Sequence, residues 1–175
     1  MKTLPDYIDY QIKVLSVGLN PSIPSVEQGY YFANPRNRFW RAFNQSSILE
    51  CALTPDPEVH SQLLNQYGIG FTDVVKRPSN MANQLKSEDY RRDAPLLREK
   101  IEVYTPGLVW FHGKLAIMNF MKHAYGVKNN WHWGLNKVPE IGSKVFVSPN
   151  PSPANAAYSL QDLIKYYNDL PYQAL

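Results

Sequence analysis

Short apolar segments alternate with helix-like segments along this chain, and no other feature of the sequence limits its fold as strongly. Strand-like apolar runs cover residues 12–18, 70–75, 107–111 and 144–147. Segments with helical character cover residues 37–47, 57–66, 93–104, 113–123 and 160–168. Strands that alternate with helices form a largely parallel sheet with helices packed against it. The sequence therefore predicts an α/β fold.

Length and composition are consistent with one domain that spans residues 1–175. Hydrophobic residues make up 44% of the chain and charged residues 19%, as in a globular protein. The single cysteine, Cys51, excludes an internal disulfide framework, and no His or Cys spacing matches a zinc site. We expect neither a metal nor another cofactor. Asp6 and Asp9 precede the first apolar run, unlike in a signal peptide, and no apolar stretch is long enough to span a membrane, so we expect a cytoplasmic protein.

Two proline-rich loops follow predicted strands. The first loop covers residues 19–35 and the second covers residues 148–159. Together they hold six of the 14 prolines, namely Pro21, Pro24, Pro35, Pro149, Pro151 and Pro153. Ligands of parallel α/β sheets bind beyond the carboxyl ends of the strands, and long ordered loops are commonly functional. Both loops leave such strand ends, so we expect one site built from residues 18–40 and 148–159.

The two loops offer amides, hydroxyls and aromatic rings but almost no charge. Glu27 is their only carboxylate, and they contain neither His nor Cys. We therefore expect neither paired-carboxylate hydrolysis nor a Ser-His-Asp triad, and the usual phosphate-binding and dinucleotide-binding motifs are absent. Asn side chains hydrogen-bond the edge of a nucleobase and aromatic rings stack on its face, so these loops suit a neutral planar ligand. The formal net charge of +3 by itself gives weak support for a nucleic-acid partner.

The same loops resemble a known family. GLNPS at 18–22 and GYYFANPRNRFW at 29–40 look like the first motif of the mismatch-specific uracil and thymine DNA glycosylases, and VSPNPSPANA at 147–156 looks like their second motif. YGIGFTDVVKRPS at 67–79 and LVWFHGKLA at 108–116 are similar to the middle section of the family. The resemblance covers residues 12–170. It implies the three-layer α/β/α sandwich of a uracil-DNA glycosylase, with a short, largely parallel central sheet.

The resemblance implies roles for residues of the first motif. Asn20 matches the catalytic asparagine of the family, which positions the water that attacks C1′ of the flipped nucleotide. Phe32 matches the aromatic residue that stacks on the extruded base. Gly18 and Leu19 lie where backbone groups contact the base edge, and Asn37 is a further candidate for base binding.

The second motif implies contacts with double-stranded DNA. Ser152 matches a serine that contacts a phosphate, and Pro153, Ala154 and Asn155 match positions that wedge into the gap left by the flipped base. The family commonly has a bulky Leu or Arg at the position of Ala154. Alanine fills a vacated base stack poorly, which leaves Asn155 or a neighbour as a substitute. Basic residues that are candidate phosphate contacts are Arg36, Arg38, Lys76 and Arg77.

The implied function is that of a monofunctional DNA glycosylase. It flips a deaminated or mismatched base, most readily uracil opposite guanine, and hydrolyses the N-glycosidic bond to start base excision repair. Extrusion costs least at a mismatch, which favours G·U over A·U pairs. Neither loop contains Lys, so we expect no lyase step, and without a carboxylate base we expect slow turnover. The resemblance also implies a monomer.

Three alternatives stay open. SPAN at 152–155 also looks like the second motif of the hypoxanthine-DNA glycosylases, in which an Asn at the position of Asn37 matters. The other two are a catalytically silent nucleic-acid-binding homologue and a hydrolase of small nucleosides or nucleotides. The presence of both Asn20 and Phe32 favours a glycosylase over a silent binder, and the lack of acidic metal ligands in the loops disfavours the nucleotide hydrolase.

Several of these residues also have a purely structural interpretation. Asn37 is a plausible N-cap of the helix that follows it. Phe39 and Trp40 lie on one face of that helix and are expected in the core. His112 closes a buried strand, which is typical of a hydrogen-bonded core histidine, and the aromatic group at 131–133 is expected to pack structurally.

Overall fold

The computed structural model describes residues 1–175 and contains one five-stranded sheet. Its strands are β1 (Val14–Gly18), β2 (Ile69–Asp73), β3 (Leu108–His112), β4 (Gly134–Asn136) and β5 (Lys144–Ser148), in the spatial order β2-β1-β3-β5-β4. β1 pairs in parallel with both β2 and β3, β3 pairs in parallel with β5, and β4 joins the edge antiparallel to β5. The predicted α/β fold with a largely parallel sheet is confirmed.

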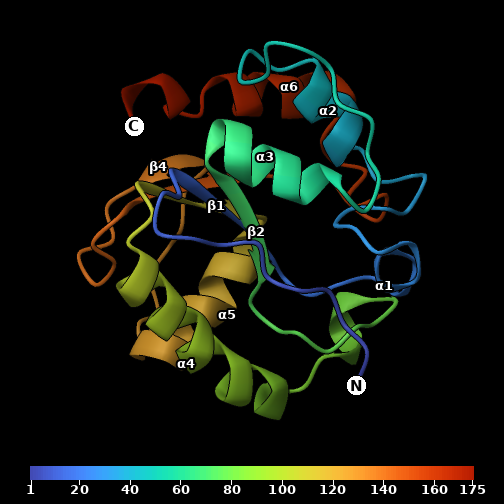
Figure 1. Ribbon diagram of the computed structural model, residues 1–175. Coiled ribbons are helices and arrows are strands. Elements are labelled where there is room, and N and C mark those ends of the chain that lie inside the picture. Colours follow the sequence, from blue (N-terminus) through green and yellow to red (C-terminus); the bar gives the residue numbers. More distant parts are fainter.

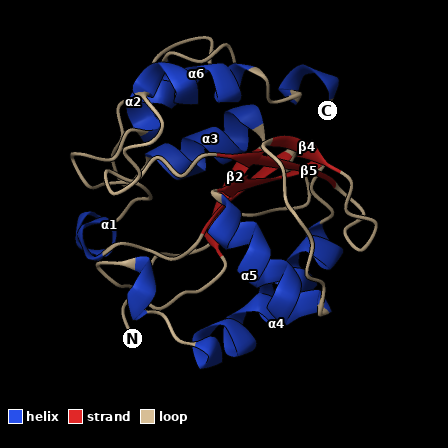
Figure 2. Ribbon diagram, turned by 180° about the vertical axis from the view of Figure 1, so that it is seen from behind, coloured by secondary structure: helices blue, strands red, loops and turns tan.

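Helices cover both faces of the sheet. They are α1 (Ile23–Gln28), α2 (Phe39–Asn44), α3 (Val59–Tyr67), α4 (Ser87–Tyr104), α5 (Lys114–Tyr125) and α6 (Leu160–Asn168), with short 3₁₀ helices at Ala82–Gln84 and Tyr172–Ala174. α2, α3 and α6 lie on one face and α4 and α5 on the other, which gives the expected three layers (Figures 1 and 2). No helix combines the length and apolar character that crossing a membrane would require.

β1, β3 and β5 each contribute to two cores, because successive strand residues point to opposite faces of a sheet. In β3, Leu108 and Trp110 pack in the core beneath α2, α3 and α6. Val109 and Phe111 pack in the other core, beneath α4 and α5. The predicted core residues Phe39 and Trp40 are buried in the first of these cores. The four parallel strands therefore form a rigid platform that is buried on both faces.

Two helices differ from the prediction. α1 lies inside the first proline-rich loop, where Ser22 caps it by accepting the Ser25 amide and Gly29 ends it in the left-handed conformation. Prolines indicate a loop, yet a proline in the first turn of a helix loses no hydrogen bond. α4 begins at Ser87 rather than at residue 93, so Pro95 lies inside the helix instead of in its first turn. The first turn of α4 is polar and acidic, which hid it from the apolar pattern.

Smaller differences concern length and one edge strand. α2 covers Phe39–Asn44 and is shorter than the predicted 37–47. β4 was not predicted, because three residues without an apolar alternation give no strand signal.

The carboxyl ends of the four parallel strands meet at one edge of the sheet. α1 lies beyond that edge, on the right of Figure 1.

Candidate functional site

A cavity of about 630 Å³ opens at the carboxyl edge of the sheet. It is lined by the end of β1 with the first loop, by the end of β2 with the segment that follows, by the β3–α5 turn, and by the second loop. The predicted site residues that line it are Gly18, Leu19, Asn20, Phe32, Asn37, Ser152, Ala154 and Asn155. The two proline-rich loops thus meet at one site, as predicted. Arg38 and Pro153 lie outside the lining.

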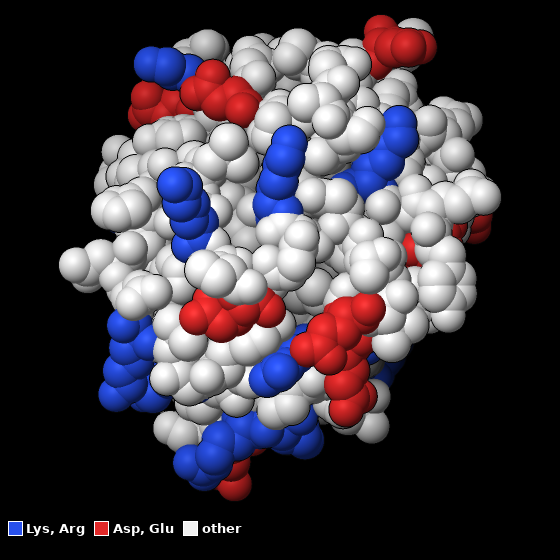
Figure 3. Space-filling model, turned by 90° about the vertical axis from the view of Figure 1, so that its left-hand side faces the viewer, with Lys and Arg blue, Asp and Glu red and all other residues white.

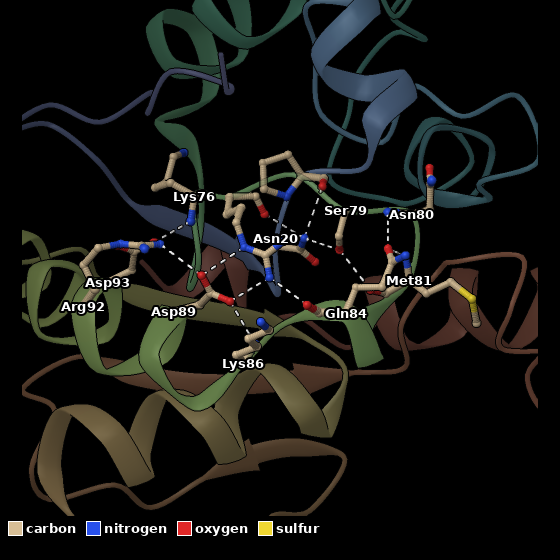
Figure 4. A network of polar contacts seen from close by, with 12 residues as sticks. Asn20, Lys76, Ser79, Asn80, Met81, Gln84, Lys86, Asp89, Arg92 and Asp93 are labelled. Atoms are coloured by element: carbon tan, nitrogen blue, oxygen red, sulfur yellow. Dashed lines mark hydrogen bonds and ion pairs between the residues drawn. The ribbon is translucent and has the colours of Figure 1, made fainter. Parts of the chain in front are cut away.

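The side-chain amide of Asn20 has a fixed orientation. Its Nδ2 donates hydrogen bonds to the Arg77 carbonyl at 2.9 Å, the Ser79 hydroxyl at 2.8 Å and the Pro21 carbonyl at 3.3 Å (Figure 4). Two of these acceptors are carbonyl oxygens, so only the nitrogen of the amide can occupy this position. No protein group donates to Oδ1 of Asn20, which stays available as an acceptor at the cavity.

Phe32 is held in a strained backbone conformation. Its φ of 59° lies in the left-handed region, which is unusual for a bulky residue and is typical of functional sites. Its ring stacks on Phe39 at a centroid distance of 4.3 Å and meets the edge of His112 at 5.1 Å. The next residue is fixed by a hydrogen bond from the Ala33 amide to the Ser25 hydroxyl. Phe32 is half-buried and presents an aromatic surface to the cavity.

Asn37, Gly18 and Leu19 also use their polar groups within the protein. Oδ1 of Asn37 accepts the Phe39 amide at 2.9 Å, so Asn37 helps to begin α2 although Arg38 occupies the N-cap position. The carbonyls of Gly18 and Leu19 accept the amides of Val74 and Val75. These bonds fix the end of β1 against the chain that leaves β2.

Asp73, at the end of β2, lines the cavity and was missed by the sequence analysis. It is 5% exposed, and its Oδ2 has no hydrogen-bond partner. Burial raises the pKa of its carboxyl group to about 7, against the opposing effect of Lys76. The expectation of a site without a carboxylate base followed from the two loops alone, whereas Asp73 comes from β2. An acidic residue that closes an apolar strand would have been the signal.

His112, at the end of β3, also lines the cavity, so it is more than the predicted core residue. It is buried, and its Nε2 lies 2.8 Å from the Ser16 hydroxyl, whereas its Nδ1 has no partner. Burial lowers the pKa of its imidazole to about 3, which keeps the ring neutral near pH 7. Asp73 and His112 thus stand on the two strands that flank β1.

The second loop is fastened to the start of α2 by Arg38. The Arg38 guanidinium donates to the carbonyls of Asn155 at 2.8 Å, Ser152 at 3.3 Å and Tyr158. The Arg38 amide also donates to the Pro151 carbonyl at 3.1 Å. The predicted role of Arg38 was contact with a DNA phosphate, but the structure directs its donors to carbonyls of the protein.

Hydrogen bonds inside the second loop leave its tip exposed. The Asn155 side chain donates to the Asn150 carbonyl, and the Ser152 hydroxyl accepts the Ala154 amide. Pro153 and Ala154 are exposed, in keeping with the predicted contact with DNA, but their side chains are small. Asn155 is committed to the loop itself, which makes it a poor substitute for a bulky wedge.

Few basic residues are free at the cavity. Of the other predicted phosphate contacts, Lys76 pairs with Asp6 at 2.8 Å and Arg77 pairs with Asp89 at 2.7 Å, whereas Arg36 is exposed. Lys114 is the one Lys or Arg in the lining, and its Nζ lies 4.6 Å from the ring centre of Trp133. The cavity is therefore close to neutral, and Trp133 forms part of its wall rather than only packing in the interior.

The fold and the cavity together define a class of protein. It is a three-layer α/β/α domain that presents an asparagine, hydroxyls and aromatic rings at the carboxyl edge of its sheet. The sequence model of the Uracil DNA glycosylase superfamily matches residues 5–171, and the chain belongs to this superfamily.

A solved structure supports the same fold. The solution NMR structure of a candidate uracil DNA glycosylase from Methanosarcina acetivorans aligns with 99% of this chain and 96% of that protein, with a TM-score of 0.63. The two sequences are 21% identical, so this likeness concerns the fold.

Proposed function

We propose that this protein is a monofunctional DNA glycosylase that removes a deaminated or mismatched base from double-stranded DNA. The observation that carries the proposal is the fixed amide of Asn20, which leaves Oδ1 free at a nearly neutral cavity of about 630 Å³. This volume is in the range of pockets that hold small molecules. Membership of the uracil DNA glycosylase superfamily supports the same activity.

The proposed reaction breaks the bond between C1′ and the base nitrogen. The electron pair of that bond leaves with the base, and positive charge develops on the sugar. A water molecule held by Oδ1 of Asn20 adds its oxygen to C1′, and its proton passes to the departing base or to solvent. Phe32 stacks on the flipped base and holds it in line. Catalysis of this kind needs oriented dipoles rather than a strong nucleophile.

The carboxyl group of Asp73 favours a substrate base that carries a carbonyl next to an N–H group. A neutral carboxylic acid can donate a hydrogen bond to the carbonyl of such an edge or accept one from its N–H group. Uracil, thymine, hypoxanthine and guanine have this edge, whereas cytosine and adenine do not. The raised pKa of Asp73 keeps a large fraction of the carboxyl group neutral near pH 7. The edge therefore favours uracil over cytosine and hypoxanthine over adenine, and a mismatch such as G·U costs less to open than a Watson–Crick pair.

Hypoxanthine is the second candidate base. Asn37 lines the cavity together with Asn20. This supports hypoxanthine, because an Asn at the position of Asn37 matters in the hypoxanthine-DNA glycosylases that the second motif resembles. Uracil and hypoxanthine share the carbonyl–N–H edge, and the assay below separates them.

The test is base release from defined duplexes. The protein is incubated with duplexes that carry G·U, A·U, G·T, or inosine opposite T or C, and abasic sites are revealed by alkaline cleavage. We expect cleavage at G·U, and Asn20→Ala should slow it at least about 100-fold, as when an oriented catalytic dipole is lost. Asn130→Ala, a change at an exposed asparagine outside the cavity lining, should leave the rate unchanged. No cleavage of any duplex by the parent protein overturns the proposal.

The same assay tests the absence of a lyase step. The expectation rested on loops without Lys, but the structure brings Lys114 from α5 into the lining. Its ammonium group lies over Trp133, so we keep the monofunctional assignment. Strand breaks that form before alkaline treatment, and that borohydride traps as a protein–DNA adduct, would contradict it.

A further inference from the structure

An exposed methionine stands at the rim of the cavity. Met81 is 58% exposed, although it lines the same cavity as Asn20. Of the large apolar residues that are exposed on this protein, only Met81 and Leu115 line the cavity. Leu115 belongs to the first turn of α5, whereas Met81 lies in the segment that follows β2. Single exposed apolar side chains are common on proteins, but the place of Met81 at the rim of the cavity puts it within reach of a ligand bound there.

When a base leaves the duplex stack, an exposed apolar side chain is needed to fill the gap. The gap must be filled, or the base returns, and proteins that open base steps commonly insert Phe, Leu, Ile, Met or Pro. The tip of the second loop offers only Pro153 and the methyl group of Ala154. A filler of adequate size must therefore come from another part of the rim.

The backbone at Met81 is rigid, as insertion into a stack requires. The Met81 carbonyl accepts the Ser79 hydroxyl at 2.9 Å, and the Met81 amide donates to the Gln84 side chain at 3.1 Å. The Asn80 amide donates to the same Gln84 oxygen at 2.9 Å. Arg77, which is paired with Asp89, donates to the Gln84 carbonyl at 2.7 Å. Only the side chain of Met81 is free to move, and methionine is the most adaptable apolar side chain.

The same network joins Met81 to the catalytic asparagine. The Ser79 hydroxyl accepts Nδ2 of Asn20 at 2.8 Å and donates to the Met81 carbonyl. Figure 4 shows Asn20 on one side of Ser79, with the Met81 side chain directed away from the network. Hydrogen bonds through Ser79 therefore fix the backbone of Met81 relative to the side-chain amide of Asn20.

We propose that Met81 is the wedge of this protein, a positioning residue that fills the gap in the base stack. Asn20 meanwhile holds the water that attacks the flipped nucleotide. The proposal rests on the proposed glycosylase function and deepens it. Because Ser79 links the two residues, full insertion of Met81 places Oδ1 of Asn20 at its working distance from the sugar. The second loop then contacts the DNA backbone, and Met81 is the residue that enters the base stack.

The experiment compares duplex and single-stranded substrates. Single-turnover base release is measured on a G·U duplex, an A·U duplex and the same uracil strand without its complement. Met81→Ala should slow release from both duplexes at least about tenfold, and most from A·U, since the unstacking cost is then uncompensated. Release from the single strand should change less than about twofold, because no stack has to be filled. Met81→Leu should restore most of the duplex rate.

Met118→Ala is the matched control, because Met118 is 43% exposed but lies outside the cavity lining, and this variant should behave as the parent protein. Equal duplex rates for Met81→Ala and the parent overturn the wedge. An equal loss on the single strand also overturns it, since that result places Met81 in the pocket instead.

A fluorescence arm separates this proposal from the proposed function. 2-Aminopurine beside the target base brightens when the base leaves the stack, whether or not the bond is cut. If the parent protein produces this signal but releases no base, the glycosylase proposal fails and the wedge is still tested by loss of the signal in Met81→Ala. An unchanged signal in Met81→Ala contradicts the wedge.

Discussion

Gly18 and Asp73 illustrate how single residues shape the site. They are register partners at the ends of β1 and β2. A Cβ atom on Gly18 would lie 2.5 Å from Oδ1 of Asp73, which is closer than non-bonded atoms approach. The absence of a side chain at position 18 therefore makes room for a carboxyl group at the floor of the cavity. The glycine that opens the first motif is required by a residue more than fifty positions away.

The titration of Asp73 gives a prediction at this scale. Its pKa is raised to about 7, so the neutral form is present below this pH and is lost as the pH rises. If only the neutral acid can donate to the base, base release by the parent protein should fall about tenfold between pH 6 and pH 8. Asp73→Asn keeps one donor and one acceptor but does not titrate. Its pH profile should be flat over this range, as measured by single-turnover release from a G·U duplex.

Asp73→Ala is the control for this prediction. It removes both donor and acceptor, so release should be slow at every pH. A decline with pH in Asp73→Asn as steep as in the parent protein would show that another group controls the profile. His112 is not that group, because burial holds its pKa near 3 and it stays neutral throughout this range.

At the scale of elements, the second loop depends on the start of α2. The loop has no regular structure of its own, yet Arg38 joins three of its carbonyls and Asn150 braces it from within. A guanidinium group presents a planar fork of donors, whereas an ammonium group is a single point of attachment. The position of the Pro153–Ala154 tip is therefore set by a residue more than a hundred positions earlier.

Arg38→Lys should loosen this loop while the charge is retained. We expect amide hydrogen exchange in residues 148–159 to become about tenfold faster, because charge-assisted hydrogen bonds of about 1.5 kcal/mol or more are lost. Binding of a G·U duplex should weaken by a similar factor. Arg36→Lys alters an exposed arginine of the same loop region and should change neither measurement. Equal exchange in the two variants would show that the loop holds itself in place.

Prediction from the sequence was most successful where the pattern is local. β1, β3 and β5 are recognisable in the sequence as continuous apolar runs, because these strands are buried on both faces. α6 is recognisable by its amphipathic spacing. α1, β4 and the first turn of α4 escaped because they are short or polar, and their stability comes from caps and neighbours.

The same distinction applies to the site. Asn20 and Phe32 lie within a contiguous motif, so the sequence indicates them. Asp73, His112 and Met81 belong to other segments and reach the cavity only through the strand order β2-β1-β3. No spacing along the chain encodes that proximity. The role of Arg38 was hidden for the same reason, because its three acceptors lie in the second loop.

For the whole molecule, the distribution of charge matters more than its sum. Lys and Arg are interspersed with Asp and Glu over the face in Figure 3, which lies on the left of Figure 1 and opposite α1. The cavity is lined by a single cation, Lys114. A net charge of +3 is thus spread rather than gathered into one basic surface on this face.

Binding to DNA should therefore depend only moderately on salt. Neutralisation of two to four phosphates corresponds to a slope of about −2 to −4 in a plot of log Kobs against log salt concentration. Fluorescence anisotropy with a G·U duplex at several salt concentrations measures this slope. Lys114→Ala should reduce it by about one if Lys114 contacts a phosphate. A slope steeper than about −6 would indicate an extensive basic surface.

The bond between Asn20 and Pro21 has a consequence for the chemical ageing of the protein. An asparagine side chain decays spontaneously when the backbone nitrogen of the next residue attacks its amide carbon and closes a five-membered imide. At position 21 that nitrogen belongs to a proline ring and carries no hydrogen, so the imide cannot form in this way. The amide nitrogen that would be expelled is also held by three acceptors. The residue on which the proposed activity depends is thereby protected from the same loss of an amino group that turns cytosine into uracil.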